Sequence, residues 1–415
     1  MKPLLTFRLN PFYLLCLSLY SLTAQSAEWS IEPSVSVREE YNDNIRLTTL
    51  PHKSVWGTSL TPSVNFSSKT EISEVTGGAR FSFNRYSGEP NLDSSDQIFS
   101  LSSKYKTERN TFGLNGSYVR DSTLASELIS TGVVVARKQR GNLTLNPSWT
   151  TFASERTWFT LDYQLSRVKY EDAAAIGLSD YNNQTASVAA VHRLSEQDQL
   201  SGTVYYSKYE TSPANFKSNT TGLQLGITHG FSETFTGLLN VGARSTSSTS
   251  QQNALVCPAP VILCQFGFIP YDVVPFTSKT RSHGYTLNAT LDKQFETTTL
   301  NSQVSREVNP SGNGSLVQTD RIGFSVANKF SPTLTGALDA SIYRSRYLGD
   351  VITRSDSRYY AVGPRLSWRM SEWWSLDTGY TYARQEYDNA GSTAATANSA
   401  YVLVRYDWPK LAVSR

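Results

Sequence analysis

The sequence predicts an all-β protein, a transmembrane antiparallel up-and-down β-barrel of about 18 strands with short periplasmic turns and long extracellular loops. Composition, hydrophobic alternation and the pattern of connections lead to this prediction. The 415 residues are 39% hydrophobic and 12% aromatic but only 18% charged, which is below the quarter that is usual in soluble proteins. A composition rich in Tyr, Phe and polar turn formers suits strands more than helices. The net charge of +3 leaves no broad basic surface, so no nucleic-acid partner is expected.

Residues 1–27 are predicted to be a signal peptide. Lys2 and Arg8 precede an apolar run from Phe12 to Leu22, and small residues follow as far as Ala27, which is the layout of an export signal. The apolar run is shorter than the roughly 20 residues of a transmembrane helix, although an uncleaved anchor is the alternative. An exported chain is compatible with a soluble periplasmic protein or an outer-membrane barrel.

Alternation with a period of two residues favours the barrel. Between Arg321 and Phe330, the apolar residues Ile322, Phe324 and Val326 are separated by small or polar ones, and residues 159–166, 223–231 and 360–370 repeat this pattern. The second face consists mainly of Gly, Ser, Thr and Asn with few charges. Such a face suits a hydrated lumen, while the apolar face suits lipid.

Connections of two lengths divide the chain. Short links are expected near residues 68–73, 106–110, 152–156, 194–198, 231–234, 294–297, 330–333 and 370–373. Long links are expected near residues 42–54, 86–95, 121–136, 170–180, 210–218, 246–281, 308–316, 347–357 and 387–397. They separate eighteen strands of roughly 10–14 residues, or 16 strands if two lie inside loops. The asymmetry predicts periplasmic turns, extracellular loops and two periplasmic termini, whereas a soluble hairpin repeat such as a propeller is the alternative.

The barrel is expected to span residues 28–408. Its final strand, Ala400–Trp408, places Val402, Val404, Tyr406 and Trp408 on one face. This arrangement resembles the closing strand that the barrel-assembly machinery recognises. Outer-membrane barrels often end on that aromatic residue, whereas here residues 409–415 continue as a short C-terminal tail.

The first expected strand carries a motif. Residues 35–45 read VSVREEYNDNI, and the motif consists of Glu40, Tyr41, Asn42, Asp43, Asn44 and Ile45. On this hexapeptide the chain resembles the β-barrel porin type 2 group, whose members often accompany exopolysaccharide or exosortase systems. The resemblance implies an outer-membrane barrel that passes exopolysaccharide or small solutes. The residues themselves also suit a turn, because Asn and Asp side chains bond to nearby backbone, or a cation at the loop base.

Catalysis is not expected. The chain has four histidines, His52, His192, His229 and His283. None lies in a Gly-x-Ser-x-Gly or His-Glu-x-x-His context. The sequence therefore predicts no enzyme, no cofactor and no metal site.

Transport is the leading functional hypothesis, because barrels of 16–18 strands enclose an aqueous channel. The residues expected to line the pore are Arg38, Arg80, Arg321, Asp339, Arg365, Asp377 and Arg405. Arg321, Arg365 and Arg405 should form an ionic ladder with Asp339 and Asp377, which either selects solutes or braces the wall. The alternative function is a non-conducting structural or adhesive surface barrel that acts through its long loops.

The 246–281 loop is the longest and holds both cysteines of the mature chain, Cys257 and Cys264. They should form a disulfide in an oxidising compartment. Because the segment is apolar, it should fold into the barrel mouth as a constriction or lid, with docking on a partner as the alternative.

The predicted location is the outer membrane of a Gram-negative bacterium. The expected partners are outer-membrane lipids and lipopolysaccharide, the barrel-assembly machinery and, if the resemblance holds, components of polysaccharide export.

Overall fold

The computed structural model describes residues 28–123, 138–172, 177–212, 215–348, 356–388 and 394–414, apart from the side chains of residues 252–255 and 413–414. The predicted signal peptide, residues 1–27, lies outside the described residues. No helix in the described part of the chain is long and apolar enough to span a membrane.

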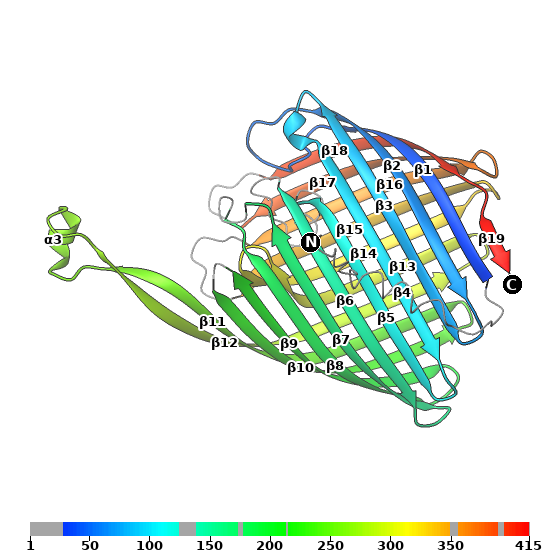
Figure 1. Ribbon diagram of the computed structural model, residues 1–415, viewed down its shortest axis with the longest axis horizontal. Coiled ribbons are helices and arrows are strands. Elements are labelled where there is room, and N and C mark those ends of the chain that lie inside the picture. The colour runs from blue at the N-terminus through cyan, green and yellow to red at the C-terminus, as the bar shows by residue number, and fades with distance from the viewer. Residues whose placement is uncertain are drawn as a thin grey trace, which may run out of the picture.

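One antiparallel sheet contains every strand, and it closes into the barrel shown in Figure 1. Its first half consists of β1 (Glu28–Asn42), β2 (Val55–Lys69), β3 (Ser73–Ser87), β4 (Ser94–Lys106), β5 (Asn110–Ser122), β6 (Gln139–Phe152), β7 (Thr157–Tyr170), β8 (Asp180–Arg193) and β9 (Asp198–Ser212). The second half consists of β10 (Phe216–Ser232), β11 (Phe235–Val256), β12 (Asp272–Gln294), β13 (Thr298–Ser311), β14 (Ser315–Lys329), β15 (Leu334–Leu348), β16 (Ser357–Arg369), β17 (Trp374–Tyr387) and β18 (Ala395–Asp407). The fold class and the strand count of 18 are confirmed.

The eight short turns also lie where the sequence predicts them. Each joins an even-numbered strand to the next one, from β2–β3 to β16–β17, and several are closed by a Ser or Thr side chain that accepts from a backbone N–H, as Thr70 does from Ser73. Glu28 pairs with Lys69 beside the first short turn, so the described chain begins at that end of the barrel. Two of the expected long links are wrong: β9–β10 and β13–β14 are joined by three residues each, because the flanking strands continue further.

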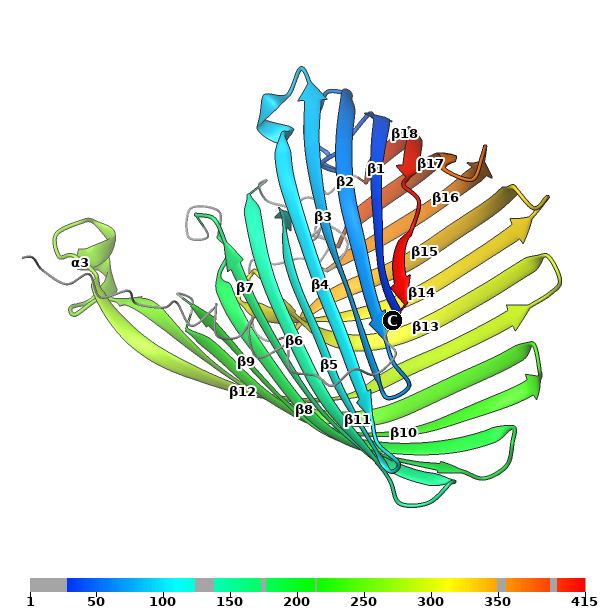
Figure 2. The ribbon, with the colours of Figure 1, turned by 45° about the vertical axis from the view of Figure 1, so that its right-hand side comes forward.

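The wall closes where β1 pairs with β18, from Ser34–Asp407 to Asn42–Ser399. Strand pairing is interrupted at Pro409, since proline has no N–H to donate to a neighbouring strand. The chain then forms β19 (Leu411–Ser414), which pairs with Glu28–Ile31 of β1 (Figure 2). The expected C-terminal tail, residues 409–415, therefore contains a strand that extends the barrel wall.

Strands β11 and β12 form an arm that leaves the barrel. They pair with each other from Phe235–Lys293 to Val256–Asp272, whereas β12 pairs with β13 only between Leu287 and Gln294. The arm points away from the wall and ends in the short helix α3 (Val261–Gln265), as Figure 1 shows. The expectation that residues 246–281 fold into the mouth is therefore wrong. The polar residues at the two ends of this segment pair with each other, so β11 and β12 run on as strands as far as Val256 and Asp272.

Candidate functional site: the barrel lumen

The two faces of the wall differ in chemistry, as the alternation predicts. Each strand from β1 to β18 exposes at least one large apolar or aromatic side chain on its outer face, for example Val37, Leu161, Val204, Leu225, Ile322 and Val402. Soluble monomers rarely expose an apolar surface that continues over every strand of a sheet. A closed barrel also leaves no unpaired strand edge in lipid. This apolar belt faces lipid, and the protein is a β-barrel of the Gram-negative outer membrane.

All seven predicted pore-lining residues lie on the opposite, inner face of the wall. Successive residues of a strand face opposite sides of the wall. Arg38 follows the outward Val37, and Arg365 precedes the outward Leu366, so both arginines face inward. Arg80 is exposed on that face, next to Ser63 of β2, and has no ion pair with the described residues.

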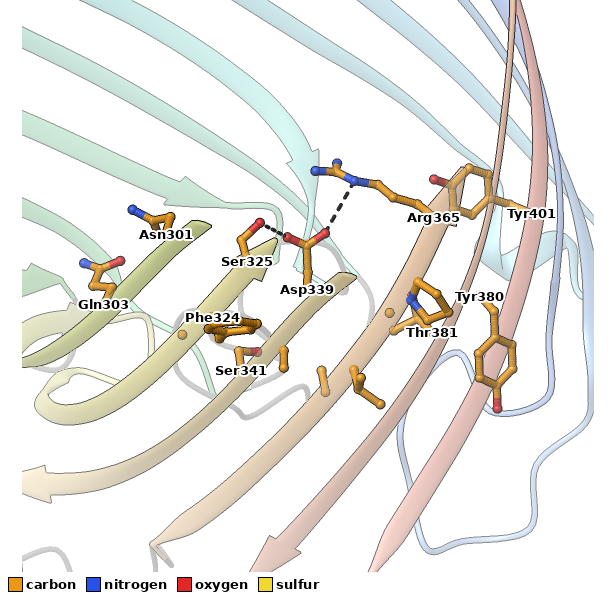
Figure 3. A pocket seen from close by; sticks show the side chains of 16 residues that line it. Asn301, Gln303, Phe324, Ser325, Asp339, Ser341, Arg365, Tyr380, Thr381 and Tyr401 are labelled. Atoms are coloured by element: carbon orange, nitrogen blue, oxygen red, sulfur yellow. Dashed lines mark hydrogen bonds and ion pairs between the residues drawn. The ribbon is translucent and has the colours of Figure 1, made fainter. Parts of the chain in front are cut away.

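The expected ionic ladder forms at one position. The Arg365 Nε lies 3.5 Å from Asp339 Oδ2, and Ser325 Oγ donates to Asp339 Oδ1 at 2.7 Å (Figure 3). Arg405 and Asp377, the other expected members of the ladder near this point, do not pair with each other. The guanidinium of Arg405 donates to Asp407 of its own strand, and Asp377 accepts from Ser367.

Tyrosine rings neighbour two more of the predicted arginines. The Arg38 guanidinium lies 4.1 Å from the centre of the Tyr401 ring, and its Nη2 is 2.9 Å from Glu40. The Arg321 guanidinium lies 5.3 Å from the Tyr343 ring, which stacks on Tyr359. Cation–π contacts of this kind hold each guanidinium beside its tyrosine ring.

A shallow cavity of about 430 Å³ surrounds the Asp339–Arg365 pair. Small residues line much of it, including Gly323, Ser341, Ala361 and Gly363. Asn301, Gln303 and Tyr401 also line it and are shown in Figure 3. The polar groups that line the cavity are amides, hydroxyls, one carboxylate and one guanidinium, and no nucleophile–base pair lies among them. No cluster of three His, Cys, Asp or Glu side chains suited to a metal occurs among the described residues.

The barrel mouth on the long-loop side is narrowed by a different element from the one expected. The tip of the β13–β14 hairpin reaches the inner face of β7–β9, where the Tyr209 hydroxyl donates to Ser311 O at 2.6 Å and Ser179 N donates to Gly312 O at 2.6 Å. Around these bonds lies a buried cluster of Val168, Tyr170, Leu178, Tyr181, Tyr209 and Leu316. A β-carbon on Gly312 would collide with the Tyr170 hydroxyl, so only glycine permits this close approach.

The same hairpin also covers the inner face of β11. The Arg244 Nη2 donates to Gln318 Oε1 at 3.2 Å, and its Nη1 donates to Thr246, while Arg244 itself is only 5% exposed. No local pattern predicts this hairpin packing, since its contacts join residues 74 and 102 positions apart, Arg244 with Gln318 and Tyr209 with Ser311.

The hexapeptide of the first strand forms a turn that fastens the first long loop to the last strand. Asn42 Oδ1 accepts from Asn44 N at 2.9 Å, and the Asp43 carboxylate accepts from both N and Nδ2 of Asn398 at 2.7 Å. Asn44 is 1% exposed, and its Nδ2 donates to Thr48 O and Thr396 O, both at 2.9 Å.

The other motif residues lie on the two faces of β1. Glu40 faces inward against Arg38, and Tyr41 packs outward on Trp56 with ring centres 5.2 Å apart. Ile45 continues the turn and is half-buried. The turn interpretation accounts for the polar residues, because amide donors already occupy the oxygens that a cation at the loop base would need.

The predicted disulfide is confirmed. Cys257 and Cys264 are bonded, with Cα atoms 6.0 Å apart, and the bridge closes the tip of the arm around α3. The tip is apolar and exposed, with Phe266 at 72% and Phe268 at 76% of their maximal accessibility.

Comparisons with known proteins add the following. No family model matches the chain, and no curated protein matches it. Among solved structures, OpdK of Pseudomonas aeruginosa is similar, with 10% identity over 92% of this chain and 99% of that chain and a TM-score of 0.45. OccAB3 of Acinetobacter baumannii has 9% identity over 92% and 99% with a TM-score of 0.44. The ferric-catecholate import receptor Fiu of E. coli K12 has 10% identity over 90% and 81% with a TM-score of 0.46.

Proposed function

We propose that the protein is a passive channel that admits small polar solutes through an aqueous lumen. The observation that carries this proposal is the inner face of the closed wall, where small and hydroxyl-bearing residues alternate with the lipid-facing ones on all sides. A barrel of 18 strands is too wide for such small side chains to fill. Water therefore occupies the space between them, and solutes of matching size can follow it.

The seven predicted pore-lining residues and their inward neighbours give the proposed channel a wall of mixed sign. Arg365 pairs with Asp339, and Arg38 pairs with Glu40, so that their fields partly cancel across a few ångströms. Arg80 also projects from this face, and it forms no ion pair with the described residues. We expect these residues to tune passage of charged solutes rather than to exclude either sign.

The exopolysaccharide cargo implied by the family resemblance stays a prediction. The comparisons do not support it. The β13–β14 hairpin narrows the mouth, and a narrowed mouth favours small solutes over a hydrated polymer. Dextrans of increasing length, added to one side of a conducting bilayer, would show the largest chain that enters.

The arm favours a second candidate function, a surface barrel that acts by adhesion. Its tip presents Val261, Ile262, Phe266 and Phe268 to solvent at the extracellular end. Such an apolar patch commonly marks an interaction site. This function does not require a conducting lumen.

Single-channel recording in planar bilayers separates the two candidates. The purified barrel should conduct in stable, ohmic steps if the lumen is hydrated and open. A correctly folded barrel without resolvable conductance at any voltage would reject the channel and leave the adhesive function. Folding is checked independently by the heat-dependent mobility shift that closed barrels show on gels.

A further inference from the structure

A cationic group lies on the outer face of β7–β10 near the long loops. It consists of Arg167, Lys169, Lys208 and Lys217 with the acid Glu210, and we call these five residues the basic rim. A second acid, Asp180, lies beside them and accepts from Tyr170 N at 2.9 Å. Register places them on adjacent strands: Arg167 is opposite Asn182, Asn182 is opposite Glu210, and Glu210 is opposite Lys217. They share the outward parity of Tyr163 and Val204, so they lie outside the lumen and apart from the proposed channel.

The basic rim borders the apolar belt. The register row two positions closer to the short turns than Lys208 contains Tyr163, Ala186 and Tyr206. Both tyrosines are exposed, at 40% and 46%. Exposed tyrosines of a barrel mark the level of the lipid headgroups, and two strand residues rise roughly 7 Å. The cations therefore lie at and just above the headgroups of the outer leaflet.

Two of the four cations have no acidic partner. The Glu210 Oε1 lies 3.0 Å from Lys208 Nζ and 3.6 Å from Lys217 Nζ, which holds these two ammonium groups side by side. Arg167 and Lys169 are exposed and form no ion pair with the described residues. A hollow of about 410 Å³ lies between them, and its charged lining residues are Arg167, Lys169, Lys217, Asp180 and Glu210.

The opposite side of the barrel shows that this surplus is not a general property of the outer rim. On β13–β17 the outward arginines are matched by acids in ion pairs, among them Arg306–Asp320, Arg346–Asp320, Arg344–Asp388, Arg358–Asp388 and Arg384–Glu386. There, protein carboxylates already neutralise the guanidinium groups. On β7–β10 the two nearby acids, Glu210 and Asp180, are fewer than the four cations, and neither forms an ion pair with Arg167 or Lys169.

We propose that the basic rim binds a phosphate group of a lipopolysaccharide-type glycolipid in the outer leaflet, whose acyl chains lie on the apolar belt below. Arg167 supplies a planar fork that matches phosphate oxygens, and Lys169 and Lys217 supply point charges on either side of it. Glu210 orients Lys208 and Lys217 without cancelling the surplus. The basic rim is continuous with the apolar belt, and this argues for a lipid. A glycolipid whose phosphate is bound at the rim would place its acyl chains directly against the apolar wall.

Native mass spectrometry of the full-length mature barrel in detergent tests this proposal, with bisphosphorylated lipid A as the probe. The variant R167Q/K169Q/K217Q should bind the probe on the order of 100-fold more weakly, because each lost charge near an anionic headgroup reduces affinity roughly fivefold. Dephosphorylated lipid A should bind the wild type as weakly as the probe binds this variant. The matched control is K293Q, because Lys293 lies on the same outer face at the short-turn end, and it should bind like the wild type.

Equal binding of the probe by the triple variant, or equal binding of dephosphorylated lipid A by the wild type, would overturn the proposal. Inorganic phosphate as competitor separates a lipid site from a site for free anions: displacement at concentrations near those of the probe would reject the lipid. If the triple variant does not fold, E210Q replaces it and should bind more tightly, since it removes the acid that pairs with Lys208 and Lys217; unchanged or weaker binding would then contradict the proposal. Conductance is read separately, so failure of the channel leaves the lipid result standing.

Discussion

At the residue scale, Asn44 is the side chain on which the first loop depends. It is buried and bonds to Thr48 and to the last strand at Thr396. The substitution N44A would leave these backbone groups without partners and should lower the free energy of unfolding by roughly 2–4 kcal/mol. Urea unfolding of the barrel in detergent, followed by tryptophan fluorescence, measures the change.

The control for this prediction is N65A. Asn65 is exposed on the inner face of β2, and its side chain makes no hydrogen bond with the described residues. Its loss should change stability by no more than about 0.5 kcal/mol. Equal effects of the two substitutions would show that the turn does not stabilise closure.

A second residue-scale prediction concerns Gly312 at the tip of the β13–β14 hairpin. G312A places a methyl group against the Tyr170 hydroxyl, so the hairpin must move off the tyrosine cluster. The mouth should then widen, and single-channel conductance should rise or become noisier. G323A is the matched control, because a β-carbon there meets no atom within 4 Å; a conductance change in both variants would speak against a constriction at the hairpin.

At the scale of elements, local patterns predicted most of the barrel. Alternation and turn chemistry depend only on neighbouring residues, so they identified eighteen strands and all eight short turns. The arm was interpreted wrongly because residues 245–252 and 277–282 are polar, like a loop, although they form a strand pair. The hairpin constriction was missed because the bond between Tyr209 and Ser311 joins residues 102 positions apart, and no short window contains it.

The same scale gives a prediction for the arm. Because it points away from the barrel, replacing residues 251–277 by a tight turn should leave conductance within the scatter of the wild type (Figure 1). The barrel should also unfold at the same urea concentration, since β11 and β12 keep their pairing below the deletion. A rise in conductance would show that the arm returns to the mouth.

At the scale of the whole molecule, closure depends on two kinds of contact at one seam. Backbone pairing joins β1 to β18 and β19. The side chains of Asp43 and Asn44 join the first loop to β18. The seam therefore connects the first and last segments of the chain, which are synthesised far apart in time. The residues that resemble the porin type 2 motif belong to this seam, which explains them structurally without reference to cargo.

The final prediction concerns the charge of the whole lumen and uses the pair Asp339–Arg365. Both side chains are about half exposed to the lumen, so removing either one uncovers the charge of the other. D339N should shift the reversal potential in a KCl gradient toward anion selectivity, and R365Q should shift it toward cation selectivity. The double variant should return close to the wild type, because the pair carries no net charge. R384Q breaks a comparable pair on the outer face, with Glu386, and should leave the reversal potential unchanged. If D339N and R365Q both match the wild type, the pair braces the wall between β15 and β16 and does not face the path of permeating ions.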